Sequence, residues 1–277
     1  MIEPFGARLA SAMANRGPLC VGIDPHPALL ASWGLPDSPV GLQQFVDITV
    51  AALGEQVAIF KPQSAFFERF GSAGIAVLER LLVQVRETGA LVLMDAKRGD
   101  IGSTMGAYAQ AYLSDGSPLA SDAVTISPYL GFGSLQPALD MAAQTGRGVF
   151  VLALTSNPEG PQLQHAVQAD GRMVAQAIAD AAGAANAGAS PMGSVGLVIG
   201  ATVGVTGVDV SGVNGPLLAP GLGAQGATAE DLRTVFGSAL ANVVPTTSRE
   251  VLSAGPSAAG LQDAAARMLE QIRQVLG

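Results

Sequence analysis

Short apolar runs recur along the whole chain and predict β-strands in eight places. The runs are rich in Val, Ile, Leu and Ala and lack the polar–apolar alternation of a half-exposed strand. Continuous apolar runs of this length are typical of strands that are buried on both faces, as in parallel sheets. The predicted strands are 19–24, 57–61, 91–95, 123–127, 149–155, 195–201, 217–220 and 242–244.

Most of the gaps between these strands can hold a helix. Apolar residues keep helical spacing at Leu78, Leu81, Leu82 and Val85 and again at Leu261, Met268, Leu269, Ile272 and Val275. Thr228 with Asp231 resembles a capping box, which predicts the start of another helix. The gap between the sixth and seventh strands is too rich in glycine for a helix. The Gly- and Ala-rich stretch 183–216 also has no functional interpretation from its sequence.

Eight strand–helix units in 277 residues predict an α/β protein with a single domain over 1–277, a (β/α)8 TIM barrel. The alternative is a doubly wound open sheet, which uses the same local pattern. No linker or repeated half divides the chain. In a barrel, reactive groups are expected at the carboxyl ends of the strands.

Composition narrows the class of function. Hydrophobic residues make up 49% of the chain and charged residues only 13%, against a usual charged share of about 25%. The net charge of −8 and the lack of a Lys/Arg cluster argue against a nucleic-acid partner, although a local basic pocket for a small anion stays open. One cysteine, Cys20, excludes an internal disulfide, and two histidines, His26 and His165, are too few for a zinc cluster.

Nothing in the sequence indicates a membrane or secreted protein. Residues 181–208 carry no charge, but Asn186, Pro191 and repeated glycines make them unsuitable as a membrane span. Glu3 and Arg8 interrupt the N-terminal region where a signal peptide would need an apolar core. We expect a soluble protein of a reducing compartment, the cytoplasm.

Polar side chains follow the predicted strands repeatedly, and this recurrence is stronger evidence for a site than any one residue. They are Asp24, Lys61, Asp95 with Lys97, Ser156, Gln225 and Arg249, after strands one, two, three, five, seven and eight. Asp24 could accept a hydrogen bond from a sugar hydroxyl or cap a turn before Pro25. Ser156 could lie in a turn or contact a ligand. His26 and His165 are predicted to be loop residues.

The segment 95–104, Asp-Ala-Lys-Arg-Gly-Asp-Ile-Gly-Ser-Thr, concentrates charge at the end of a buried strand. Asp95, Lys97 and Asp100, with Lys61 from the neighbouring strand, could form an alternating ring of two acids and two lysines. A structural ion-pair network is the alternative, but four converging charges in a protein of low charge favour catalysis. A lysine between carboxylates stays protonated, so it could stabilise a developing carbanion and then give it a proton.

The segment 221–226 matches G-x-G-x-x-G between a strand and a helix. A dinucleotide site is one interpretation, but no acidic residue ends the next strand and few residues remain after it. In a barrel, the loops after strands seven and eight commonly bind phosphate. The amides of Gly221 and Gly223 with the Arg249 guanidinium would suit that role. A simple glycine-rich turn remains the alternative for the glycines alone.

Together these residues resemble the orotidine 5'-phosphate decarboxylase family. The segment 92–104 is similar to the family signature D-x-K-x-x-D-[IV]-x-x-T. Further family motifs occur in the family's order: Gly22-Ile-Asp24, Phe60-Lys-Pro62, Leu154-Thr-Ser156, Pro220 to Gly226, and Ser248-Arg249. The resemblance covers nearly the whole chain, and the Phe-Lys-Pro-Gln and Asp-Ala-Lys-Arg-Gly-Asp forms look most like the bacterial branch with longer chains.

The resemblance implies decarboxylation of orotidine 5'-monophosphate (OMP) to UMP, without cofactor or metal, in a homodimeric barrel with shared active sites. It implies that Lys97 stabilises and protonates the carbanion and that Asp95 lies near the leaving carboxylate. The resemblance also implies ribose contacts for Lys61 and Asp24, phosphate contacts for Gln225 and Arg249, and a pyrimidine contact for Ser156. Asp100 and Thr104 would reach into the partner's site. Ile101, Gly221 and Gly223 are further expected substrate-binding residues.

Two rival functions stay open. A magnesium-dependent sugar-phosphate lyase of the same superfamily also carries D-x-K-x-x-D, but Lys61, the Gln225 loop and the extension from Ile101 to Thr104 favour the nucleotide enzyme. A catalytically silent protein that binds a phosphate ligand is the second rival, and the intact charged set argues against it.

Overall fold

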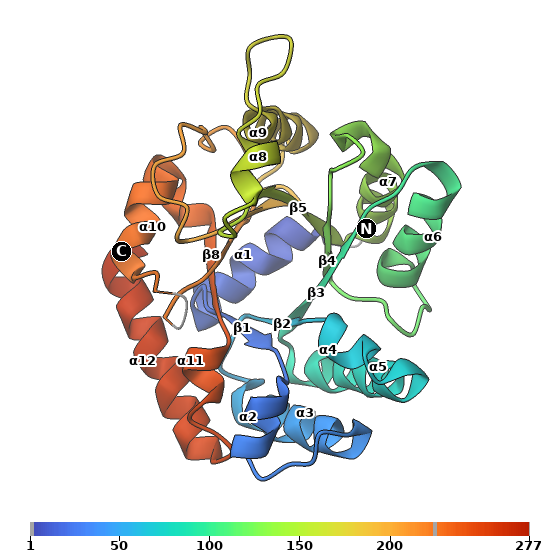
Figure 1. Ribbon diagram of the computed structural model, residues 1–277, viewed down its shortest axis with the longest axis vertical. Coiled ribbons are helices and arrows are strands. Elements are labelled where there is room, and N and C mark those ends of the chain that lie inside the picture. The colour runs from blue at the N-terminus through green and yellow to red at the C-terminus, as the bar shows by residue number, and fades with distance from the viewer. Residues whose placement is uncertain (1–2, 224–225, 277) are drawn as a thin grey trace.

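The computed structural model describes residues 3–223 and 226–276 of the chain. Its eight strands are parallel and follow one another into a closed barrel, because β8 pairs with β1 as well as with β7. Figure 1 shows helices arranged around this barrel. The strands are β1 Cys20–Ile23, β2 Ile59–Pro62, β3 Leu91–Arg98, β4 Ala123–Ile126, β5 Gly148–Leu154, β6 Val195–Ile199, β7 Leu217–Pro220 and β8 Val243–Thr247. The predicted (β/α)8 barrel is confirmed, and the open sheet is wrong because the sheet closes.

Two strands run further than the sequence predicts. β3 continues past Asp95 to Arg98, because the polar side chains that follow Met94 find partners within the barrel. β8 covers Val243–Thr247 rather than 242–244, with Pro245 inside the strand opposite Ala219. Proline is usually excluded from strand interiors, so the sequence pattern ended this strand too early.

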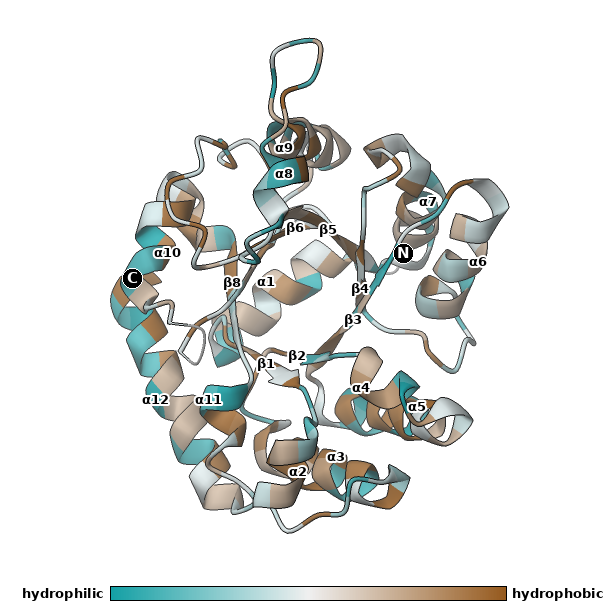
Figure 2. Cartoon of the chain, viewed as in Figure 1, coloured by the Kyte–Doolittle hydropathy of each residue, from teal (hydrophilic) through white to brown (hydrophobic). Residues whose placement is uncertain are grey.

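Apart from α1, the helices lie outside the barrel; the helices carry both hydrophilic and hydrophobic residues, whereas β5 and β6 are predominantly hydrophobic (Figure 2). They are α1 Phe5–Arg16, α2 Pro27–Ser32, α3 Pro39–Leu53, α4 Ala65–Glu68, α5 Gly71–Thr88, α6 Gly102–Leu113, α7 Gln136–Thr145, α8 Gly160–Gln164, α9 Val174–Ala185, α10 Ala229–Phe236, α11 Arg249–Leu252 and α12 Ala258–Leu276, with short 3-10 helices at Phe132–Leu135 and Gly237–Asn242. The predicted stripe of α5 is buried, and so are Leu261, Met268 and Ile272 of α12. Thr228 and Asp231 form the predicted capping box of α10.

The helix α1 closes the amino-terminal end of the barrel and crosses behind its centre in Figure 1. Phe5 and Leu9 are fully buried with inward-facing strand residues such as Cys20 and Leu93. The ring of Phe5 meets Phe150 edge to face, with ring centroids 5.9 Å apart. Side chains of α1 and of the strands therefore fill the amino-terminal end of the barrel, so a ligand site can form only at the carboxyl ends of the strands.

The connection between β6 and β7 has no helix, as its glycine content predicts. Instead the buried side chain of Asn186 holds the region together, since its amide donates to the carbonyls of Val195 (2.7 Å) and Val213 (2.9 Å). Val210 and Val213 are also buried. Small residues are needed at part of the stretch 183–216, because an added Cβ at Gly193 or Gly215 would collide with the Asn186 side chain, whereas Val205 is 86% exposed.

Within the described residues, no helix combines the length and the apolar character needed to cross a membrane.

Candidate active site

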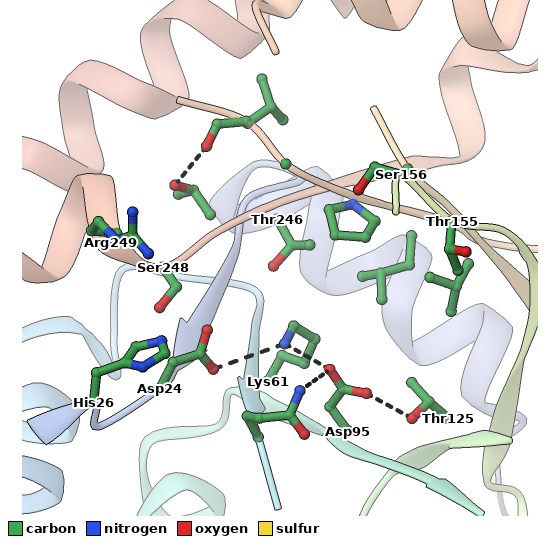
Figure 3. Close-up of a pocket in the computed structure, with 18 of the residues that line it drawn as sticks. Asp24, His26, Lys61, Asp95, Thr125, Thr155, Ser156, Thr246, Ser248 and Arg249 are labelled. Atoms are coloured by element: carbon green, nitrogen blue, oxygen red, sulfur yellow. Dashed lines mark hydrogen bonds and ion pairs between the residues drawn. The ribbon is translucent and has the colours of Figure 1, made fainter. Parts of the chain in front are cut away.

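A cavity of about 710 Å³ opens at the carboxyl ends of the strands. It brings together most of the polar residues that the sequence places after strands. The predicted site residues that line it are Asp24, Lys61, Asp95, Lys97, Ser156, Gly221 and Arg249. His26, predicted only as a loop residue, also lines it and lies beside Asp24 in Figure 3.

Four charged side chains form a row across the floor of the cavity. Lys61 Nζ lies 3.0 Å from Asp95 Oδ2 and 4.0 Å from Asp24 Oδ1, and Lys97 Nζ lies 2.6 Å from Asp95 Oδ1. The two lysines differ in exposure, because the Lys61 side chain is 9% exposed and that of Lys97 is 45% exposed. The row thus has a buried centre, Lys61 and Asp95, and ends at Lys97, whose side chain is far more exposed.

Two neutral side chains that the sequence analysis missed complete the coordination of Asp95. Gln63 Nε2 donates to Oδ2 (2.9 Å) and the Thr125 hydroxyl donates to Oδ1 (2.8 Å). Gln63 follows Lys61 by two residues and so keeps the same side of the chain, and Thr125 is a polar residue inside an otherwise apolar strand. Their positions gave a weak signal, a polar residue within a buried strand for Thr125 and directly after one for Gln63, but not their partner.

The charges of the row hold one another in the ionised state. Burial by itself opposes ionisation of Asp95, but Lys61 and Lys97 outweigh it and keep the pKa of this carboxyl far below its usual range. Burial likewise opposes protonation of Lys61, yet Asp95 and Asp24 raise its pKa above the ordinary lysine value. At neutral pH the centre of the row is therefore a carboxylate flanked by a fixed ammonium group.

Asp24 has unused capacity to bind a ligand. Its Oδ1 is buried and has no hydrogen-bond partner among the described residues. A buried carboxylate oxygen without a donor is costly, so a hydroxyl group entering the cavity would find a strong acceptor there. In the described part of the chain, no three His, Cys, Asp or Glu side chains gather closely enough to hold a metal ion.

The opening has a cationic side and a polar side. Arg249 and Ser248 lie near Asp24, whereas Thr155 and Ser156 lie across the cavity from them (Figure 3). Gly221 lines the cavity but Gly223 does not, and Gln225 lies outside the described residues.

The turn after β7 is tied to β8. The Thr247 hydroxyl donates to the carbonyl of Leu222 (3.2 Å), and the strand continues two residues later into Arg249. The N–H of Gly223 is already used within the turn, where it donates to the Ala227 carbonyl (3.0 Å). The Arg249 guanidinium beside the cavity is the group here that suits an anion such as phosphate.

Asp100, Ile101 and Thr104 do not line the cavity of their own chain. Asp100 Oδ1 accepts the N–H of Ile101 (2.8 Å), and Ile101 is 61% exposed. The predicted ring of two acids and two lysines is therefore not closed within one chain. Asp24, and not Asp100, is the second acid beside Lys61. Asp100 lies away from the row because it follows the end of β3 at Arg98.

Comparison with known proteins gives one consistent result. A sequence model of the family described as orotidine 5'-phosphate decarboxylase / HUMPS matches residues 17–264. The chain is 65% identical over 275 residues to the orotidine 5'-phosphate decarboxylase of Salinispora arenicola (strain CNS-205), with 99% of each chain covered. It is 60% identical over 272 residues to that of Streptomyces coelicolor, with 98% of each chain covered.

Solved structures agree with the sequence matches. A crystal structure from Streptomyces avermitilis ma-4680 is 60% identical, with a TM-score of 0.97 over 99% of this chain and 96% of that chain. The OMP decarboxylase of Leishmania donovani is 30% identical, with a TM-score of 0.78 over 99% of this chain and 98% of that chain. The chain belongs to the orotidine 5'-phosphate decarboxylase / HUMPS family.

Proposed function

We propose that this protein is a carboxy-lyase that converts OMP to UMP in pyrimidine nucleotide synthesis, with Lys97 as the catalytic cation and proton donor. The observation that carries the proposal is the row of Asp24, Lys61, Asp95 and Lys97 across the floor of the cavity. The decarboxylase names of relatives at 60–65% identity support this activity rather than a sugar-phosphate lyase.

We expect the substrate to bind the cavity in the following orientation. Its phosphate would lie at Arg249 and the glycine turn at Gly221, and Gln225 would join them. The ribose hydroxyls would reach the carboxylate of Asp24, whose Oδ1 accepts no hydrogen bond from the described residues, and the ammonium of Lys61. The pyrimidine would then lie over the Asp95–Lys97 pair, with Ser156 at its polar edge. Binding energy from the distant phosphate would orient the ring over the pair.

The chemical step needs a fixed positive charge. When the bond between C6 and the carboxylate breaks, CO₂ leaves and the electron pair stays on C6 in the ring plane, where the π system cannot delocalise it. The ammonium of Lys97 stabilises that pair and transfers one proton to C6, which gives UMP. Asp95 stays ionised because Lys61 and Lys97 hold its pKa low, so it would lie as an anion beside the substrate carboxylate. Bringing the two anions together would disfavour the bound substrate relative to the transition state.

The walls of the cavity strengthen this electrostatic effect. Leu152, Val198 and Leu218 line it beneath the polar opening, and Val198 and Leu218 are buried in the barrel core. Charge–charge interactions are several times stronger in such a poorly hydrated site than in water. Apolar walls would also accept the neutral CO₂ that leaves.

We further propose a homodimer in which each active site is completed by its partner, in the cytoplasm. Asp100, Ile101 and Thr104 lie outside the cavity of their own chain, directly after the strand that carries Asp95 and Lys97. Ile101, which follows β3, and Tyr129, which follows the adjacent strand β4, are 61% and 74% exposed, which supports an apolar contact with a partner chain.

The proposal is tested by following the ultraviolet absorbance of OMP with purified protein in the presence of EDTA. Conversion to UMP is expected. If folded protein leaves OMP unchanged and acts on a ketose phosphate only after magnesium is added, the protein is a sugar-phosphate lyase. Binding of UMP without turnover of either substrate would instead indicate a silent phosphate-binding protein.

A further inference from the structure

The pairing of β3 with β4 is irregular at the active site. Leu93 and Met94 pair with Ala123 and Val124, but the next pair joins Arg98 to Ile126. Three residues of β3, 95–97, therefore lie opposite the single residue Thr125. Bulges of this kind redirect side chains and are common beside active sites.

The bulge puts Lys97 in a backbone conformation that lysine rarely adopts. Its φ angle is +48°, in the left-handed region that favours glycine. Such a conformation persists only where the surroundings hold it. The N–H of Lys97 donates to the Thr125 hydroxyl at 3.0 Å, so Thr125 binds the strained residue directly.

The same hydroxyl also binds the partner of the Lys97 ammonium. It donates to Asp95 Oδ1 at 2.8 Å, and that oxygen lies 2.6 Å from Lys97 Nζ. A hydroxyl carries one donor and two acceptor lone pairs, so it can make both bonds at once. Thr125 is 1% exposed, which leaves little room for water to replace either bond.

We propose that Thr125 is a positioning residue, whose hydroxyl clamps the β3 bulge so that the Lys97 ammonium is held against Asp95 where the substrate reacts. This inference rests on the proposed decarboxylase function and adds a residue from β4 to it. With one bond to Asp95 and one to the Lys97 backbone, the hydroxyl acts through these two groups rather than on the substrate.

Three substitutions of Thr125 distinguish the effect of its hydroxyl from the effect of its side-chain shape. Thr125→Val keeps the shape and removes the hydroxyl, Thr125→Ser keeps the hydroxyl and removes the methyl, and Thr125→Ala removes both. We expect Thr125→Val to lower kcat roughly 10- to 100-fold, the range for a small misplacement of a catalytic group. The KM and the Kd for UMP should stay within about twofold of wild type. Thr125→Ser should recover most of the kcat.

The pair Thr125→Ser and Thr125→Ala gives the same test if the valine variant does not fold, because these two variants differ only in the hydroxyl. A kcat for Thr125→Val within about twofold of wild type would overturn the inference. So would equal loss in the Ser and Ala variants, or a rise in the Kd for UMP that matches the fall in kcat. A wild-type protein without turnover of OMP would refute the proposed function instead. In that case, a crystal structure of Thr125→Val still tests the clamp: the Lys97–Asp95 ion pair should be displaced, and an unchanged pair would overturn it.

Discussion

Replacement of Asp95 by asparagine should destabilise the fold as well as abolish activity, because Asp95 is the centre of the buried charge row. The variant Asp95→Asn keeps the shape of the side chain but removes the charge between Lys61 and Lys97. Lys61 is then left with Asp24 at 4.0 Å as its remaining counter-charge. Its side chain is only 9% exposed, so water cannot solvate the ammonium fully.

The size of the effect follows from this geometry. At 3.0 Å the attraction between Lys61 and Asp95 is about 5.5 kcal/mol for an effective dielectric constant of about 20. Desolvation offsets part of this attraction, and removing one partner of a buried pair typically costs 3–5 kcal/mol. Because Asp24 and the half-exposed Lys97 soften the loss, we expect a decrease of about 2–4 kcal/mol in the free energy of unfolding at pH 7. That decrease corresponds to a fall in Tm of roughly 3–7 °C for 277 residues, given an unfolding entropy of about 2.1 cal/mol/K per residue.

Urea unfolding of the two proteins at several pH values measures this effect. The pKa of Asp95 is lower in the folded state than in the unfolded state, so its contribution is complete above the unfolded pKa of about 3.9 and is lost as the pH falls through the folded value. The difference between wild type and variant should therefore shrink below about pH 5. Asp37→Asn, which breaks an exposed pair with Arg69, serves as a control that should not change stability measurably. Equal stability of wild type and Asp95→Asn at pH 7, or a loss that does not change with pH, would refute the reasoning.

Three further results are expected. Lys97→Ala should lower kcat by several orders of magnitude. The Kd for UMP and the free energy of unfolding should change little, because the Lys97 side chain is 45% exposed. Activity within about tenfold of wild type in steady-state kinetics, a barrier change of only ~1.4 kcal/mol, would contradict the assignment of Lys97. Arg249→Ala should lower kcat/KM for OMP about 10- to 100-fold, because a charge-assisted contact with the phosphate is lost. The slow reaction of orotidine, which has no phosphate, should not change. Equal losses of kcat/KM for both substrates would exclude a phosphate role for Arg249. Inactive Lys97→Ala and Asp100→Ala proteins that are unfolded, mixed and refolded together should recover about a quarter of wild-type activity. Half of the randomly formed dimers would be mixed, and each mixed dimer would hold one intact shared site of its two. No recovery of activity in the mixture would argue against shared sites.

The barrel could be predicted from the sequence because its strands are buried on both faces and so appear as apolar runs. The residues at the strand ends could be predicted for the same reason, since Asp24, Lys61 and Lys97 are charges placed where a buried run stops. Thr125 and Gln63 could not, because their roles depend on the register between strands. The register between β3 and β4 shifts by two residues, and this shift cannot be read from the pattern of apolar residues in either strand.

The helix α1 was missed for a related reason. Its buried positions, Phe5 and Leu9, make a narrow stripe that the spacing of apolar residues does not distinguish from a short loop. Its role becomes visible only when Phe150 is known to face the barrel axis. The sequence here leaves open both the existence of α1 and the residues that it contacts.

Under the proposed mechanism, the unequal burial of the two lysines would let one carboxylate serve both stability and catalysis. When Lys97 gives up its proton, Asp95 keeps the buried ammonium of Lys61 at 3.0 Å and the donors Gln63 and Thr125. The loss of charge on Lys97 therefore does not leave an uncompensated anion in the core, which would cost several kcal/mol. Lys97, with its side chain 45% exposed, is free to take a new proton from solvent after the product leaves. A site with both lysines equally buried would hold its charges as firmly but could not exchange the proton that each turnover consumes.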